Sequence, residues 1–443
     1  MTVGAKSWTT HFISITYLVF TGVLFAWTDR ANFVVLMTIY GISFLAYLLL
    51  LYKKEVSLNY LIGVGLIANL SAFFFSPQLS PDSYRFLWDG AMVWKGHNPL
   101  DASPQYLIDK AGYVDSQYMQ SLYAGLSDLS KENYTCYPSV NQFYFVAANL
   151  TNSISINLFL LKLLIFLTQL IGLRYLWKLL EHFKLSSKRM LIVALNPLWL
   201  IETVGNLHFE GVMISFLIIG FYFLAKQKWI LAALFLAFAV QVKLVPLVLF
   251  PFLLRYLGWG RSALMYSITG VFIALLALIY FRVDNNQNFL DSLKLYFQSF
   301  EFNSLIYHHY IEYGHTLFGF YPNNTFGTNL SRISTFLIVC LAFFGGKINF
   351  QAMATRMIFG LLVYYLLATT VHPWYILTIL GLSVFTRYTF GIIWSAVIFL
   401  TYASYSDMAP DDFRLLIHLE YAVLLLTVLY ELIRQKPLLR FDF

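Results

Sequence analysis

Long apolar runs are the feature that most limits how this chain can fold. They recur along nearly its whole length, and the mean hydropathy is +0.67. Only 12% of the 443 residues are charged, whereas soluble domains carry about 25%. In lipid, the backbone polar groups must be satisfied within the spanning segment, which an isolated apolar run achieves only as a helix. The sequence therefore predicts an all-α, polytopic integral membrane protein.

The apolar runs predict about fourteen transmembrane helices, given that a full crossing needs about 20 residues. They lie near 12–28, 33–52, 58–76, 154–178, 190–201, 211–225, 229–242, 244–257, 263–281, 329–345, 355–370, 374–387, 389–404 and 414–433. Several are short, notably 190–201 and the two runs that flank Lys243. Short helices at membrane depth must pack against protein or line a cavity, so we expect them to form walls of a functional site.

Lysine and arginine gather in alternate loops, which predicts the orientation. Such loops stay cytoplasmic, and both termini fall on that side. The opposite, periplasmic or extracytoplasmic face of a cell (inner) membrane then holds two long outer loops, 77–153 and 282–328. Loops this long are usually functional or disordered, and their many aromatic residues argue against disorder. We therefore expect the functional machinery on the non-cytoplasmic face.

The chain divides into three predicted parts. Residues 1–57 form an N-terminal transmembrane hairpin, 58–387 a catalytic transmembrane core, and 388–443 a C-terminal transmembrane hairpin with a cytoplasmic tail. The net charge of +7 is explained by the cytoplasmic loops, so no nucleic-acid partner is expected. The two cysteines, Cys136 and Cys340, lie in a polar loop and an apolar run, and no Cys/His spacing indicates a zinc site.

Two carboxylates stand at the start of the first outer loop. Asp82 and Asp89 are seven residues apart, so on a surface helix over 81–96 they would lie on nearly one face. Asp82 would begin this helix, where an aspartate also serves as a simple cap. The functional alternative is a general base that takes the proton of an attacking hydroxyl group.

Other polar residues follow or interrupt apolar runs at the outer face. Tyr134 and Tyr137 either anchor the interface or line a site. Glu202, His208 and Glu210 follow a short helix, and ionisable residues at membrane depth indicate function unless they form a solvated turn. His208 and Glu210 are also candidates to join Asp82 at a divalent metal, although their spacing is not diagnostic.

One cation and one histidine complete the candidates. Lys243 interrupts an apolar run, so it either pairs with an anion such as a lipid phosphate or extends its amine to the interface. His372, with Trp374 and Tyr375, stands at the outer end of another run. A histidine there either donates to a phosphate or is an ordinary interface residue.

These segments together resemble GT-C-type membrane glycosyltransferases, and most nearly the bacterial polyprenyl-phosphate-mannose-dependent mannosyltransferases. The resemblance covers about residues 58 to 387. It rests on segments in the expected order: Ser80–Gly90 with Gly96–Leu100, Tyr134–Pro138, Asn196–Gly211, Lys243–Pro246 and His372–Tyr375.

The resemblance implies an inverting transfer of a hexose, with mannose expected, from a polyprenyl-phosphate donor. The acceptor would be a lipid or glycan on the non-cytoplasmic face, with membrane lipids as surroundings. It assigns the base to Asp82. Asp89 is the second choice, because many relatives carry two adjacent acids where this chain has Pro81 and Asp82. The resemblance requires no cofactor, and it leaves open whether a divalent metal takes part.

The remaining roles follow from this resemblance. Asp89, Glu202 and Glu210 would orient hydroxyls. Lys243 and His372 would contact the phosphate, and Tyr134 and Tyr137 would shape the sugar pocket. The wider substrate-binding set adds Tyr84, Arg85, His208, Trp374 and Tyr375.

Three alternatives remain. A transporter or flippase would share the hydrophobicity, but the chain has no visible repeat and its polar residues gather at one face. A structural subunit of an envelope complex, or a transferase of another polyprenyl-phosphate sugar, is also consistent with these residues.

Overall fold

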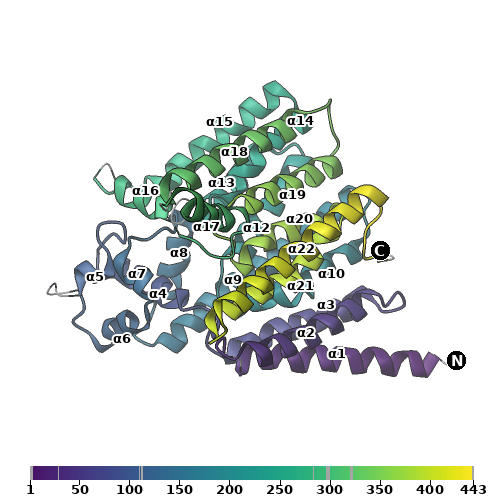
Figure 1. The fold of residues 1–443 in the computed structure, drawn as a ribbon, viewed down its shortest axis with the longest axis horizontal. Coiled ribbons are helices and arrows are strands. Elements are labelled where there is room, and N and C mark those ends of the chain that lie inside the picture. The colour runs from purple at the N-terminus through teal and green to yellow at the C-terminus, as the bar shows by residue number, and fades with distance from the viewer. Residues whose placement is uncertain are drawn as a thin grey trace.

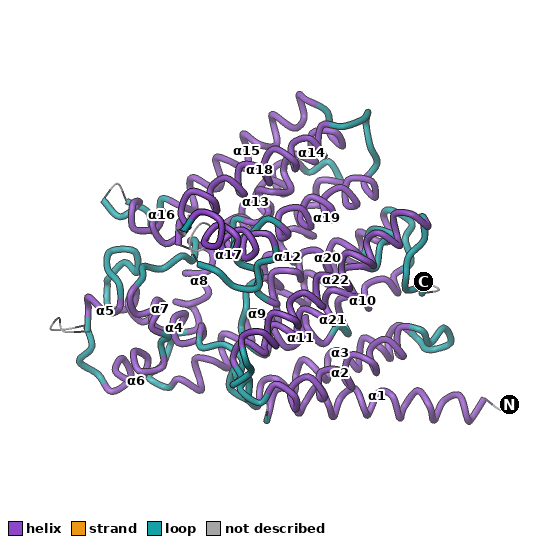
Figure 2. Tube along the Cα trace, viewed as in Figure 1, coloured by secondary structure: helices purple, strands orange, loops and turns teal. Residues whose placement is uncertain are grey.

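The computed structural model describes residues 3–27, 29–108, 110, 113–282, 284–295, 300–319 and 323–441. Within these ranges every regular element is a helix (Figure 2). The one β contact in the described residues is an isolated bridge between Phe302 and Thr370. The predicted class, an all-helical polytopic membrane protein, is confirmed.

The helices begin and end as follows: α1 (Val3–Ala26), α2 (Phe33–Leu51), α3 (Leu58–Ser71), η1 (Ala72–Phe74), α4 (Asp82–Trp94), α5 (Pro104–Leu107), α6 (Gln117–Gly125), α7 (Asp128–Glu132), α8 (Ser139–Ala148), α9 (Ile154–His182), η2 (Ser187–Met190), α10 (Leu191–Ala194), α11 (Pro197–Leu200), η3 (Ile201–Gly205), α12 (Glu210–Ala225), α13 (Trp229–Val242), η4 (Val245–Leu249), α14 (Phe250–Leu257), α15 (Trp259–Ala277), α16 (Asn286–Lys294), α17 (Ile306–Phe318), α18 (Asn323–Phe343), α19 (Phe350–Leu366), η6 (Pro373–Ile376), α20 (Leu377–Ser383), α21 (Phe390–Val397), η7 (Ile398–Tyr405) and α22 (Pro410–Arg434).

Six of the described helices are each long and apolar enough to cross a membrane: α1, α2, α9, α15, α18 and α22. A seventh span is possible if the segment Pro197–Gly205 and α12 act together, with a bend of 107° between them. The other predicted runs fall on shorter apolar helices or helix pairs, such as α13 and the η4–α14 pair. These short segments include the ones that we expected to line a site.

The helices lie side by side, and the first outer loop is folded against one end of them (Figure 1). The loop helices α4 to α7 gather at that end. The start of α1 and the end of α22 lie at the opposite end (Figure 1). The predicted first outer loop is thus separated from both chain ends by the length of the helical bundle.

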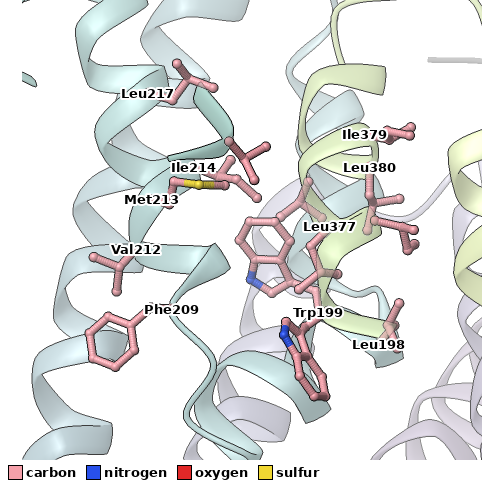
Figure 3. Packing of buried hydrophobic residues seen from close by; sticks show 14 of the residues in the cluster. Leu198, Trp199, Phe209, Val212, Met213, Ile214, Leu217, Leu377, Ile379 and Leu380 are labelled. Carbon is pink, nitrogen blue, oxygen red and sulfur yellow. The ribbon is translucent and has the colours of Figure 1, made fainter. Parts of the chain in front are cut away.

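The packing between α12 and α20 sets the position of the two segments that precede these helices, and both segments carry predicted site residues. Buried side chains of α12, among them Met213 and Ile214, face Leu377 of α20 (Figure 3). Gly381 allows the close approach, because a Cβ there would lie 2.9 Å from Ile214 Cγ2. The turn that precedes α12 and the short helix η6 that precedes α20 are therefore held next to each other.

The predicted surface helix over 81–96 corresponds to α4, but it is mostly buried. Phe86, Leu87 and Trp88 are each at most 2% exposed. The reason is that α6 and α8 cover α4, which its own sequence does not reveal. Gly90 of α4 lies directly against α8, where a Cβ would come within 2.3 Å of the Phe145 carbonyl oxygen.

Candidate active site

A cavity of about 370 Å³ opens where the first outer loop meets the helical bundle. This volume is within the range of small-molecule sites, about 300–1,000 Å³. Eight predicted site residues line it: Asp82, Tyr137, His208, Glu210, Lys243, His372, Trp374 and Tyr375. Five others are not among the lining residues: Tyr84, Arg85, Asp89, Tyr134 and Glu202.

Asp82 lies at the first turn of α4 with its carboxylate toward this cavity. Its side chain is 29% exposed, and its Oδ2 is 4.0 Å from His208 Nδ1. The Asp82 backbone N–H donates to the Ser80 hydroxyl at 3.2 Å. Burial among protein groups raises the pKa of Asp82, while the positive charge of Lys243 partly offsets the rise.

His208 is presented by an unusual turn between η3 and α12. Leu207 has a φ of 66°, a left-handed conformation that is strained for a bulky residue. The turn is closed by the His208 N–H, which donates to the Glu202 carbonyl at 2.9 Å. Locally stored strain of this kind often marks a functional site.

Glu202 lies behind His208 rather than in the cavity. Its Oε2 is 3.5 Å from His208 Nε2. Its carboxylate accepts from the Tyr402 hydroxyl at 2.6 Å and from the Asn206 amide at 3.4 Å. The imidazole thus lies between two carboxylates, Asp82 on the cavity side and Glu202 on the buried side.

Lys243 pairs with an anion of the protein itself. It forms an ion pair with Glu210, and its ammonium lies 4.1 Å from the centroid of the Tyr375 ring. Lys243 is 31% exposed and Glu210 only 3%. Lys243 therefore offers an N–H donor to the cavity, and much of its positive charge is already balanced by Glu210.

Aromatic rings form a continuous stack along one wall. The His208 and Trp374 rings are 3.5 Å apart, Trp374 and His372 4.4 Å, and His372 and Phe302 4.5 Å. His372 Nδ1 is buried without a hydrogen-bond partner in the described part of the chain. The faces of Trp374 and His372 are therefore covered by neighbouring rings. The cavity lining combines such aromatic residues with a few polar atoms, as small-molecule sites commonly do.

Asp89 belongs to a separate, buried network. It pairs with Arg85 at 2.8 Å and accepts from the Gln142 amide at 3.1 Å. Arg85 also donates to the carbonyls of Ser130 and Asn133 at 2.6 and 2.9 Å. These bonds join α4 to α8 and to the segment around α7. The i,i+4 spacing of Arg85 and Asp89 was a signal for this pairing.

The two remaining predicted tyrosines also contact protein away from the cavity lining. Tyr84 packs against Gly125, where a Cβ would lie 2.3 Å from the tyrosine ring. The Tyr134 carbonyl accepts from the Ser292 hydroxyl of α16 at 2.9 Å. Both residues hold the outer loop in place.

The lining residues that the sequence analysis did not name as site candidates include Arg30, in the turn between α1 and α2, and Tyr405, at the end of η7. The Arg30 guanidinium carbon lies 4.3 Å from the Tyr405 ring centroid. A sequence signal did exist for Arg30, because a basic residue on the predicted non-cytoplasmic side departs from the usual charge bias.

Metal ligation was left open by the sequence. Over the described ranges, no group of three or more His, Cys, Asp or Glu side chains is arranged to hold a metal ion.

Comparison with known proteins gives one match. The model of the MptA/B family, described as alpha-(1->6)-mannopyranosyltransferase, N-terminal domain, matches residues 3–258. This is more than half of the 443 residues, and it includes Asp82, His208, Glu210 and Lys243. No curated protein and no solved structure matches the chain.

Proposed function

This chain belongs to the alpha-(1->6)-mannopyranosyltransferase family, and we propose that it transfers mannose from a polyprenyl-phosphate donor with inversion at the anomeric carbon. The acceptor is a lipid or glycan at the non-cytoplasmic face of the cell membrane. The observation that supports this best is the Asp82 carboxylate, which faces a cavity shared with His208 and Lys243.

Asp82 acts as the general base in this proposal. As the acceptor oxygen bonds to the mannose C1, its proton moves to the Asp82 carboxylate. The bond between C1 and the phosphate oxygen breaks, and polyprenyl phosphate leaves with the electron pair. Base catalysis of this kind contributes about 10²- to 10⁴-fold. A single displacement with attack opposite the leaving group inverts the anomeric carbon.

His208 and Glu202 support Asp82 from behind. Glu202, held by Tyr402 and Asn206, is close enough to orient the imidazole. The imidazole then lies beside the Asp82 oxygen. Preorganised polar groups stabilise charge that develops during reaction, because they need not reorganise at that moment. We therefore assign positioning roles to His208 and Glu202.

Other lining residues suit the sugar phosphate. Lys243 and His372 line the same cavity, and Tyr375 lies under the lysine. A cation or a ring N–H there would interact with the phosphate oxygens as the leaving group gains charge. Tyr137 offers an apolar ring for the sugar, whereas both faces of the Trp374 indole are covered by the rings of His208 and His372.

The test is a transfer assay on the full-length protein in proteoliposomes, with radiolabelled polyprenyl-phosphate-mannose and a membrane lipid extract as acceptor. Wild type should form labelled product, and Asp82→Asn should lose about 10²- to 10⁴-fold of this activity. Asp128→Asn is the matched control, since its side chain in the same loop is 91% exposed, and it should keep near-full activity.

Three outcomes would contradict the proposal. Near-full activity in Asp82→Asn would place the base elsewhere. Product from a nucleotide sugar but not from the lipid-linked sugar would make the donor class wrong. Flux of unmodified lipid-linked sugar across the vesicle membrane, without any covalent product, would favour a transporter.

A further inference from the structure

The N-terminal hairpin, which had no role in the sequence analysis, contributes a side chain to the cavity. Its turn is built by local bonds: the Asp29 carboxylate accepts from the Ala31 N–H at 2.9 Å, and the Asn32 side chain caps α2. Asp29 is therefore engaged in the turn itself. Arg30, which lies between Asp29 and Asn32 in the chain, lines the cavity.

Two contacts hold the Arg30 guanidinium in a defined plane. Its Nη1 donates to the Leu79 carbonyl at 3.4 Å, and the group lies over the Tyr405 ring at 4.3 Å. Leu79 and Tyr405 also line the cavity. A guanidinium stacked by one face keeps its N–H edges available, and that edge geometry matches two oxygens of a phosphate.

The charges that line the cavity leave Arg30 as the cation that lacks a carboxylate partner. Besides histidines, the charged lining residues are Arg30, Lys243, Asp82 and Glu210. Lys243 is paired with Glu210, whereas no ion pair joins Arg30 to a carboxylate within the described ranges. An anionic ligand would gain most from the unpaired guanidinium.

We infer that Arg30 binds the phosphate of the polyprenyl-phosphate donor, so that the N-terminal hairpin is part of the substrate site. This inference rests on the proposed function. The donor phosphodiester carries one negative charge, and the phosphate gains a second as its bond to C1 breaks. Arg30 would therefore stabilise the leaving group more than the bound donor, and its loss would lower kcat more than it raises KM.

The experiment uses full-length Arg30→Gln and Arg30→Lys in proteoliposomes, with Arg261→Gln, an exposed arginine of α15, as the control. Three quantities are measured: kcat and KM for polyprenyl-phosphate-mannose, inhibition by polyprenyl monophosphate, and inhibition by inorganic phosphate. Arg30→Gln should lower kcat at least tenfold and weaken inhibition by polyprenyl monophosphate by a similar factor. Arg30→Lys should fall between Arg30→Gln and wild type, and Arg261→Gln should match wild type.

Each contrary result has a distinct meaning. Wild-type kcat and wild-type inhibition in a folded Arg30→Gln would overturn the inference. Equal competition by inorganic phosphate and polyprenyl monophosphate would assign Arg30 to a free phosphate instead of the lipid. If wild type transfers no mannose, the proposed function fails. The role of Arg30 is then tested by the direct binding of polyprenyl monophosphate, measured as a thermal shift. This binding should still be weaker in both Arg30 variants than in wild type. Equal binding in all variants would overturn it.

Discussion

At the scale of single residues, α4 presents two aspartates with different surroundings. Asp82 lines the cavity, its side chain is 29% exposed, and one of its oxygens lies 4.0 Å from an imidazole nitrogen. Asp89 is fully buried and occupied by Arg85 and Gln142. A base must keep an oxygen available to substrate, so the geometry favours Asp82 and gives Asp89 a structural role.

The surroundings of Asp82 predict a pH dependence. Burial raises its pKa above the ordinary value, and Lys243 opposes the rise. The base is active when deprotonated, so kcat/KM should fall as pH drops through this raised pKa. Lys243→Gln removes the opposing charge and should move the acid limb of the kcat/KM profile to higher pH. Lys131→Gln is the control, because the Lys131 ammonium pairs with the exposed Asp128. An acid limb that stays in place or moves to lower pH in Lys243→Gln would contradict Asp82 as the base.

The main effect of Asp89→Asn should be a loss of stability of the folded protein. The change leaves the Arg85 charge buried without its partner, and breaking a buried pair typically costs about 3–5 kcal/mol. Arg85 keeps its bonds to two carbonyls, so the lower end of this range is expected. Thermal unfolding in detergent measures it, with Asp82→Asn as the comparison that should unfold close to wild type. A stable but inactive Asp89→Asn would instead argue that this carboxylate takes part in the chemistry.

At the scale of elements, hydropathy predicted the helices well because it is a local property. Every predicted apolar run falls on a described helix or helix pair. What the sequence did not predict was which elements cover which. The burial of α4 and the position of the hairpin turn beside Tyr405 depend on contacts between distant segments.

The candidate site also has a part that the sequence predicted and a part that it did not. Polar residues that interrupt apolar runs, such as His208 and Lys243, were found because a charge at membrane depth is costly and rarely accidental. Their partners were not predicted. Glu202 and Glu210 looked equivalent in the sequence, yet Glu202 lies 3.5 Å from an imidazole nitrogen behind the cavity, whereas Glu210 forms an ion pair with a lysine. The left-handed turn at Leu207 lies between the two glutamates in the chain.

The contact between α4 and α8 predicts the effect of Gly90→Ala. The new methyl group would overlap the Phe145 carbonyl, so α4 must shift, at a cost of about 1–3 kcal/mol. Because Asp82 begins the same helix, kcat should fall along with the unfolding temperature. Gly63→Ala in α3 meets nothing within 4 Å and should preserve both quantities. If Gly90→Ala matches wild type in both, α4 does not depend on this contact to place Asp82.

At the scale of the whole molecule, the cavity is assembled from parts spread over most of the chain. Arg30, Asp82, His208, Lys243 and Tyr405 all line it. The family match ends at residue 258, so Tyr405 and the His372 segment come from beyond the matched region. Arg30, in the turn between α1 and α2, and Tyr405, at the end of η7, therefore line the cavity together with residues of the central helices.

Because this site lies at one end of the helical bundle, the orientation of the protein in the membrane can be tested. Gln120 lies in α6 beside the cavity end, and Lys226 follows α12, whose first residue, Glu210, lines the cavity. These two exposed positions should therefore lie on opposite faces of the membrane. Single cysteines at Gln120 and Lys226, in a protein with Cys136 and Cys340 changed to serine, can be labelled with an impermeant maleimide. In right-side-out vesicles, Gln120→Cys should label at once and Lys226→Cys only after permeabilisation, because the basic loops stay cytoplasmic. The reverse pattern would place the cavity on the cytoplasmic face and would require the donor to be used there.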